Sequence, residues 1–68
     1  MGMTRVSQAW VRVSPEKYVH CSGARIERRG LPAAIPGWYL VSADPLQPEL
    51  RFAPTPQGCD EALTAFSR

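Results

Sequence analysis

The sequence TPQGCDEALTAF at residues 55–66 has the pattern of a short amphipathic helix. Thr55 is a favourable N-cap, and Pro56 follows at the first helical position, where its missing N–H leaves no hydrogen bond unmade. The apolar residues recur at intervals of three and four and therefore form one stripe: Cys59, Ala62, Leu63 and Phe66. A helix of about three turns is not stable alone, so this stripe must pack on a sheet.

Three further residues of this segment have predicted positions or roles. Asp60 and Glu61 are expected in the first turns of the helix, where the macrodipole favours acidic side chains. Gly58 lowers helix propensity, which indicates that the backbone approaches another segment closely at this point. The stripe also defines the expected core, which consists of Leu40, Phe52, Leu63 and Phe66, with Ile26 and Val41 beside them.

The residues before this helix contain short β-prone runs, at 10–13, 18–21, 24–28, 38–41 and 49–52. Ser22-Gly23 predicts a tight hairpin between the second and third runs, because glycine permits the positive φ that such turns need. The run WYLV at 38–41 is apolar on both faces and predicts the central strand. We therefore predict an α+β fold: a small antiparallel sheet of three to four strands packed by one C-terminal helix, in the order β-β-β-(β)-α.

Length and composition indicate one small domain. The chain has 68 residues, of which 44% are hydrophobic and 21% charged, the composition of a folding chain. Residues 1–8 have no periodicity and are expected to be a flexible N-terminus, followed by a single domain over residues 9–68. A chain of this length buries only about 60% of its unfolded surface, so its core is thin.

Cys21, Cys59 and the single histidine, His20, are the only residues that suggest nucleophilic or metal chemistry. They lack a C-x-x-C pair and do not complete a four-ligand zinc site. Cys59 near the helix N-terminus, with His20 as its base, is one interpretation. The stronger interpretation makes Cys59 a small buried hydrophobe of the helical stripe. We therefore predict no catalytic residue, no metal and no cofactor, and a protein that is not an enzyme.

Localisation follows from the same residues. Two cysteines do not form the dense disulfide framework of a small secreted domain. The sequence also lacks the apolar core of a signal peptide and any run of about 18 apolar residues. We expect a reducing, cytoplasmic setting and no membrane partner.

Charge is distributed unevenly along the chain. Residues 1–30 carry six basic and two acidic side chains, net +4, whereas residues 31–68 carry two basic and four acidic ones, net −2. If the first strands are neighbours, several basic side chains share the exposed face of the sheet with aromatic residues, an arrangement that can hold nucleic acid. The candidate nucleic-acid-binding residues are Arg12, Arg25, Arg28 and Arg29, with Lys17 beside them.

The expected sheet and helix carry one resemblance to a known family. The run Trp38–Val41, followed by Arg51-Phe52 and the Glu61-Ala62-Leu63 helix, fits the outline of a small three-stranded sheet backed by one C-terminal helix. This outline resembles the arm-type DNA-binding domains of phage integrases, and the resemblance implies binding to nucleic acid. The prolines at 32, 36, 45 and 48 depart from the tight hairpins of that family.

The six aromatic residues favour a different function. A single short helix covers one face of a sheet, so aromatic and apolar side chains on the other face stay half exposed, and such a surface favours self-association. We predict a non-enzymatic interaction domain that binds a protein, including its own copy as a homodimer. The alternative is a nucleic-acid-binding accessory domain that uses a basic sheet face.

Overall fold

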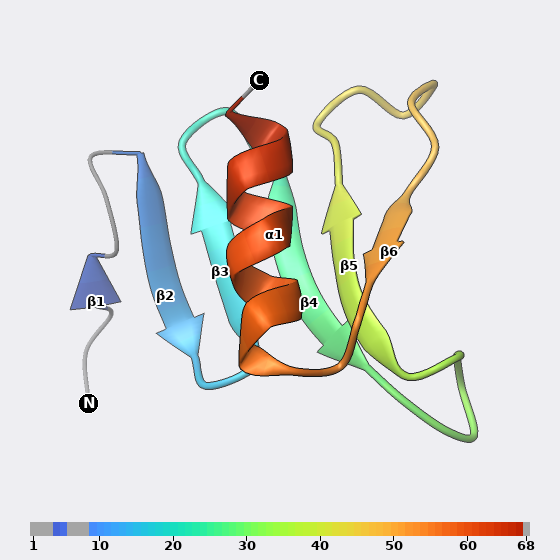
Figure 1. Cartoon of the computed structure of the whole chain (residues 1–68). Helices are drawn as coiled ribbons and strands as arrows, with labels where there is room; N and C mark the ends of the chain where they lie inside the picture. Colours follow the sequence, from blue (N-terminus) through green and yellow to red (C-terminus); the bar gives the residue numbers. More distant parts are fainter. Residues whose placement is uncertain (1–3, 6–8, 68) are drawn as a thin grey trace.

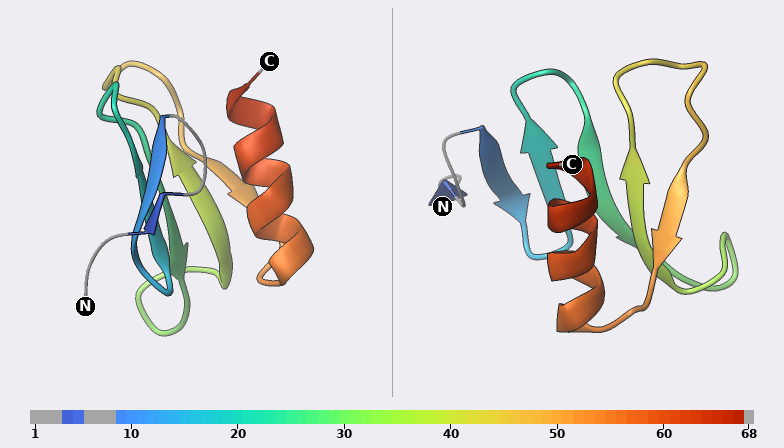
Figure 2. Two further views of the ribbon diagram at one scale, coloured as in Figure 1. Left: turned by 90° about the vertical axis from the view of Figure 1, so that its left-hand side faces the viewer. Right: turned by 45° about the horizontal axis from the view of Figure 1, so that its top comes forward.

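A computed structural model describes residues 4–5 and 9–67 of the chain, with side chains from residue 9 onward. The chain forms one antiparallel sheet and one helix, α1 (Pro56–Phe66), which lies across a single face of that sheet (Figure 1). Figure 2 shows the sheet edge-on, with the helix on one side and no element on the other. The predicted α+β fold, a small antiparallel sheet packed by one C-terminal helix, is confirmed.

The sheet has six strands, which is more than the three to four expected, and each strand pairs with the next along the chain. The count is higher because the short connections place every β-prone run beside the previous one, and a two-residue strand precedes them. The strands are β1 (Thr4–Arg5), β2 (Trp10–Ser14), β3 (Lys17–His20), β4 (Arg25–Arg29), β5 (Gly37–Val41) and β6 (Leu50–Phe52).

The N-terminal segment is described only in part. The expectation of a flexible segment over residues 1–8 lies outside the described residues, except at Thr4–Arg5. There, Thr4 is the register partner of Arg12 and Arg5 that of Val11.

Local sequence signals account for the hairpin and for the start of the helix. Gly23 has a φ of 98° in the turn between β3 and β4, as the Ser22-Gly23 signal predicted. The Thr55 hydroxyl accepts a hydrogen bond from the Gly58 N–H at 3.2 Å, which confirms the predicted N-cap.

Two expectations about the start of α1 have different outcomes. A Cβ on Gly58 would overlap the backbone carbonyl oxygen of Ala53, so the close approach is confirmed. Asp60 and Glu61 lie near the start of α1 as expected, but its first turn contains no acidic residue, so the expected benefit from the macrodipole is reduced. The helix begins at Pro56, which places both carboxylates in the second turn, beyond the strongest effect of the macrodipole.

The core lies between α1 and strands β4 to β6, with Trp10 of β2 reaching into it. Ile26 and Leu40 are buried as expected, whereas Phe52, Leu63 and Phe66 are only half-buried against the core. The complete buried set is Trp10, Ala24, Ile26, Trp38, Leu40, Cys59 and Ala62. Among the described residues, Ile26 is the only large side chain that is fully buried, so the core is thin.

The expected position of Val41 beside the core is wrong. It is the register partner of Arg25, whereas its neighbour Leu40 is the partner of Ile26. Successive residues of a strand point to opposite faces, so Val41 lies on the face that α1 does not cover. The run WYLV forms β5, which pairs on both sides, with β4 and with β6, but it is the fifth of six strands and therefore not the central strand that was expected.

Candidate functional site

No described element covers the face of the sheet opposite α1, and we call it the open face (Figure 2). Its register places valines of β2, β3 and β5 in one row with Arg25 of β4. A second row contains charged residues and Tyr39. The open face consists of Val11, Lys17, Val19, Arg25, Glu27, Arg29, Tyr39, Val41 and Arg51.

A charge network occupies the middle of the open face. The Glu27 carboxylate accepts hydrogen bonds from Arg25 Nε at 3.0 Å and from Arg29 Nε at 2.7 Å. Arg29 Nη1 also donates to Glu49 Oε1 at 2.8 Å, and the guanidinium lies 4.4 Å from the centre of the Tyr39 ring. Two arginines and two carboxylates therefore neutralise one another on this face.

The pKa of Glu27 reflects this network. Partial burial of the carboxylate raises its pKa, but the hydrogen bonds and charges of Arg29 and Arg25 outweigh that effect, and the net pKa is below its ordinary value. The hydrogen bond with Glu49 raises the pKa of Arg29, so this guanidinium stays charged. The network is ionised at neutral pH.

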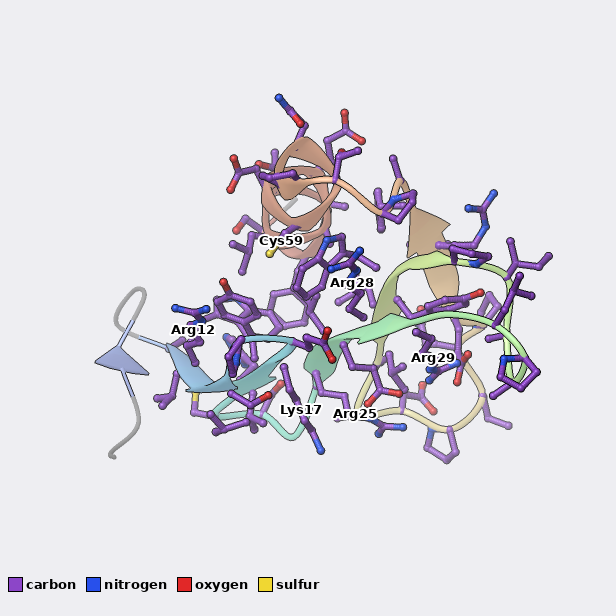
Figure 3. The ribbon with its side chains drawn as sticks, turned by 90° about the horizontal axis from the view of Figure 1, so that it is seen from below. Arg12, Lys17, Arg25, Arg28, Arg29 and Cys59 are labelled. Atoms are coloured by element: carbon purple, nitrogen blue, oxygen red, sulfur yellow. The ribbon has the colours of Figure 1, made fainter. Side chains whose placement is uncertain are left out.

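The four predicted nucleic-acid-binding residues do not share one face. Arg25 and Arg29 lie on the open face with Lys17, whereas Arg12 and Arg28 lie on the side of α1 (Figure 3). Arg28 and Arg29 are neighbours in one strand and therefore point in opposite directions. Of the four, Arg25 and Arg29 are paired with carboxylates, and the described residues provide no carboxylate within 4.0 Å of Arg12 or Arg28.

The apolar part of the open face is formed by Val11, Val19, Val41 and the Tyr39 ring, all half-buried. The Tyr39 hydroxyl donates to the Ile35 carbonyl at 2.6 Å, which ties the loop before β5 to the end of this face. The alternation in residues 24–28 predicts Arg25 and Glu27 on one face of their strand, and the register agrees with it. Sequence reasoning missed Tyr39 and Glu49 as members of this surface, because Glu49 is distant in sequence and carries no local signal.

Cys59 and His20 do not form a joint site, although the neighbouring Cys21 Sγ lies 3.9 Å from His20 Nδ1. Cys59 is buried in the first turn of α1, and His20 packs against Phe66 in the last turn, with ring centroids 4.4 Å apart. His20 Nδ1 accepts a hydrogen bond from the Ser22 N–H at 3.0 Å, in the turn that contains the exposed Cys21. The two parts of the proposed nucleophile and base pair are thus at opposite ends of the helix.

The thiol of Cys59 is also unsuited to nucleophilic chemistry. Burial raises its pKa, and Asp60 adds to this effect, while the Tyr18 hydroxyl and Arg12 oppose it only in part. A catalytic thiol needs the opposite shift, because the thiolate is the nucleophile. Within residues 4–5 and 9–67, no three His, Cys, Asp or Glu side chains gather in a way that could hold a metal ion.

Comparisons with protein-family models, with curated proteins and with solved structures found no match. The resemblance to phage-integrase domains therefore stays a prediction, and the six-stranded sheet differs from the three-stranded outline on which it was based. Within the described residues, no helix is long and apolar enough to span a membrane.

Proposed function

We propose that this chain is a non-enzymatic protein-binding domain whose open face docks a second copy of itself. The observation that carries the proposal is the unbalanced layering: α1 covers one face of the sheet, while the valines and Tyr39 of the other face remain half exposed. Burial of apolar surface is the main favourable term in protein association. Two such faces packed together would give the sheet its missing layer.

The chemistry of the open face suits a protein partner better than a phosphate backbone. Arg25 and Arg29 already bind Glu27 and Glu49, so their guanidinium groups have less capacity for phosphate oxygens. An arginine stacked on a tyrosine, as in Arg29 and Tyr39, is typical of protein interfaces, which are enriched in both residue types. The network neutralises Arg25 and Arg29, so that Lys17 and Arg51, at its margins, are the charges that two facing copies would have to keep apart.

The size of the face and the thinness of the core support a second copy as the partner. The molecule measures 31 × 30 × 19 Å along its principal axes, and the two long dimensions span the sheet. A face of this size can supply the roughly 800 Å² per partner of a standard interface. Domains of fewer than about 70 residues commonly gain stability by oligomerisation.

Two unpaired cysteines support a reducing, cytoplasmic setting for this assembly.

Sedimentation equilibrium tests the proposal. We expect a mass of about twice the 7.5 kDa chain at micromolar concentration. Val19→Lys places a charge in the valine row of the open face and should convert the dimer to a monomer, because burying an unpaired charge is costly. Leu46→Lys is the matched control, since Leu46 is 90% exposed in the loop between β5 and β6 and should leave the mass unchanged.

Circular dichroism of each variant checks that the fold persists, and Val11→Lys serves as a second substitution in the same row if Val19→Lys unfolds. A wild-type chain that sediments as a monomer at all concentrations contradicts the proposal. A dimer that survives both valine substitutions would place the interface elsewhere and overturn it as well.

A further inference from the structure

A cleft of about 370 Å³ opens on the side of α1, between the first turn of the helix and strands β3 to β5. It is separated from the open face by the sheet itself, so docking of a second copy there would leave it accessible. The cleft is lined by Tyr18, Arg28, Trp38, Pro54, Thr55, Pro56, Cys59 and Asp60.

One arginine that lacks a carboxylate partner lines this cleft, and a second such arginine lies near it on the same side of the sheet. Arg28 lines it directly and is the register partner of Trp38. Arg12 is the register partner of Tyr18, and its charge acts on both Tyr18 and Cys59, two of the lining residues. Figure 3 shows Arg12 and Arg28 on the side of the helix, with Cys59 above the sheet near them.

Arg12 and Arg28 differ from Arg25, Arg29 and Arg51 in that no side-chain hydrogen bond or ion pair within the described residues holds them. Arg25 and Arg29 are neutralised by carboxylates, and Arg51 donates a hydrogen bond to the Pro36 carbonyl. No ion pair within the described residues holds Arg12 or Arg28. Guanidinium groups that are not neutralised and that flank a cleft are suited to bind phosphate oxygens in a bidentate manner.

Tyr18 and the apolar residues form the walls of the cleft. Burial, together with the neighbouring Cys59, raises the pKa of Tyr18, and its hydroxyl is already in a hydrogen bond with the Cys59 side chain. Trp38, Pro54 and Pro56 give the cleft apolar walls, which favour a ligand that carries more than a bare anion. Asp60 is the only carboxylate among the lining residues, and it lowers the affinity for an anion.

We propose that this cleft binds the phosphate group of a nucleotide or of a nucleic-acid strand, which Arg28 contacts in the cleft and which Arg12 attracts from its neighbouring position on the same side of the sheet. The site differs from the basic sheet face expected from the sequence, because it uses the two arginines on the side of α1. It does not depend on self-association through the open face.

Titrations followed by ¹H–¹⁵N NMR test the site, with inorganic phosphate, AMP and a twelve-residue oligothymidylate as probes. We expect each probe to shift signals of residues around the cleft, and the shifts to weaken with added salt. Arg12→Gln and Arg28→Gln should each lower the affinity, Arg28→Gln by about tenfold, which is the usual effect of losing one charge-assisted hydrogen bond. Arg51→Gln is the matched control, because it removes the same charge from the open face and should change the affinity little.

Asp60→Asn provides a test that does not rely on loss of function. Removing the one carboxylate of the cleft should raise the affinity for all three probes, because it removes the repulsion between two negative charges. The probes distinguish the two sources: equal affinity for AMP and the oligonucleotide indicates a free nucleotide, and tighter, more salt-sensitive binding of the oligonucleotide indicates a strand.

Three results would overturn the proposal. The first is that no probe shifts the signals of the cleft at low salt. The second is that Arg51→Gln weakens binding as much as Arg12→Gln and Arg28→Gln do, because the effect would then be that of net charge alone. The third is that Asp60→Asn leaves the affinity for every probe unchanged or lowers it.

Discussion

Single residues at the start of α1 fix how the helix meets the sheet. Gly58 is buried, and its lack of a side chain lets the first turn of the helix lie against the Ala53 backbone. Glycine in a helix costs about 1 kcal/mol relative to alanine in intrinsic propensity. Its presence here is explained by the close approach, which outweighs that cost.

We therefore predict that Gly58→Ala lowers the free energy of unfolding by about 1–3 kcal/mol, the usual cost of overpacking, although alanine is the better helix former. The control is Gly30→Ala, because a Cβ at Gly30 has no atom within 4 Å. Urea denaturation measures both. An unchanged or increased stability of Gly58→Ala would show that the backbone can move away from Ala53 at little cost.

At the scale of elements, α1 is stabilised at its N-terminus by Thr55 and along its length by contact with β4 to β6. Eleven residues are too few for an isolated helix to be stable, so the cap and the packing act together. The half-buried Phe66 extends this packing to β2 and β3, with its ring 5.2 Å from the Trp10 ring and 4.4 Å from the His20 ring.

Thr55→Ala is expected to lower the free energy of unfolding by about 1 kcal/mol, because the Gly58 N–H loses its hydrogen-bond acceptor. Thr55→Ser retains a hydroxyl acceptor at the same position and should keep most of that stability. Thermal denaturation followed by circular dichroism compares the two variants. Equal losses in Thr55→Ala and Thr55→Ser would indicate that the methyl group, and not the cap, matters.

At the scale of the whole molecule, a thin core on one face is accompanied by a charge network on the other. The network connects β4 to the segment before β6 through Arg29 and Glu49. It therefore stabilises an arrangement of strands, in addition to its effect on the surface charge.

We predict that the free energy of unfolding falls as the pH is lowered from about 6 to about 3, because the folded state holds the pKa of Glu27 below its unfolded value. The stabilisation is fully present above the unfolded-state pKa and is lost as the pH falls through the folded-state pKa. Since these pairs are partly exposed, the contribution is expected to be about 1 kcal/mol or less.

Urea denaturation at a series of pH values measures this dependence. Glu27→Gln should flatten it, whereas Glu61→Gln, which removes an exposed carboxylate of α1 that has no ion pair in the described chain, should leave it nearly unchanged. If both variants keep the full pH dependence, the network does not contribute to stability.

The amino-acid sequence by itself determined the features that depend on neighbouring residues. Thr55 and Pro56 marked the start of α1, Gly23 marked a turn with positive φ, and Gly58 marked a close approach. These signals are local, because caps, turns and periodicity follow from backbone sterics and hydrogen bonding within a few residues. They were enough for the fold class, though not for the number of strands.

Tertiary structure decided which residues share a surface. The position of α1 excluded Val41 from the core and left it on the open face, and the register of β4 to β6 brought Arg29 to Glu49. The tertiary structure also places Arg12 and Arg28 on the opposite face of the sheet from the paired arginines. Arg28 lines a cleft there, and Arg12 lies on the same side. Such contacts join residues distant in sequence, and they depend on strand register and on the face that the helix covers, which no local pattern encodes.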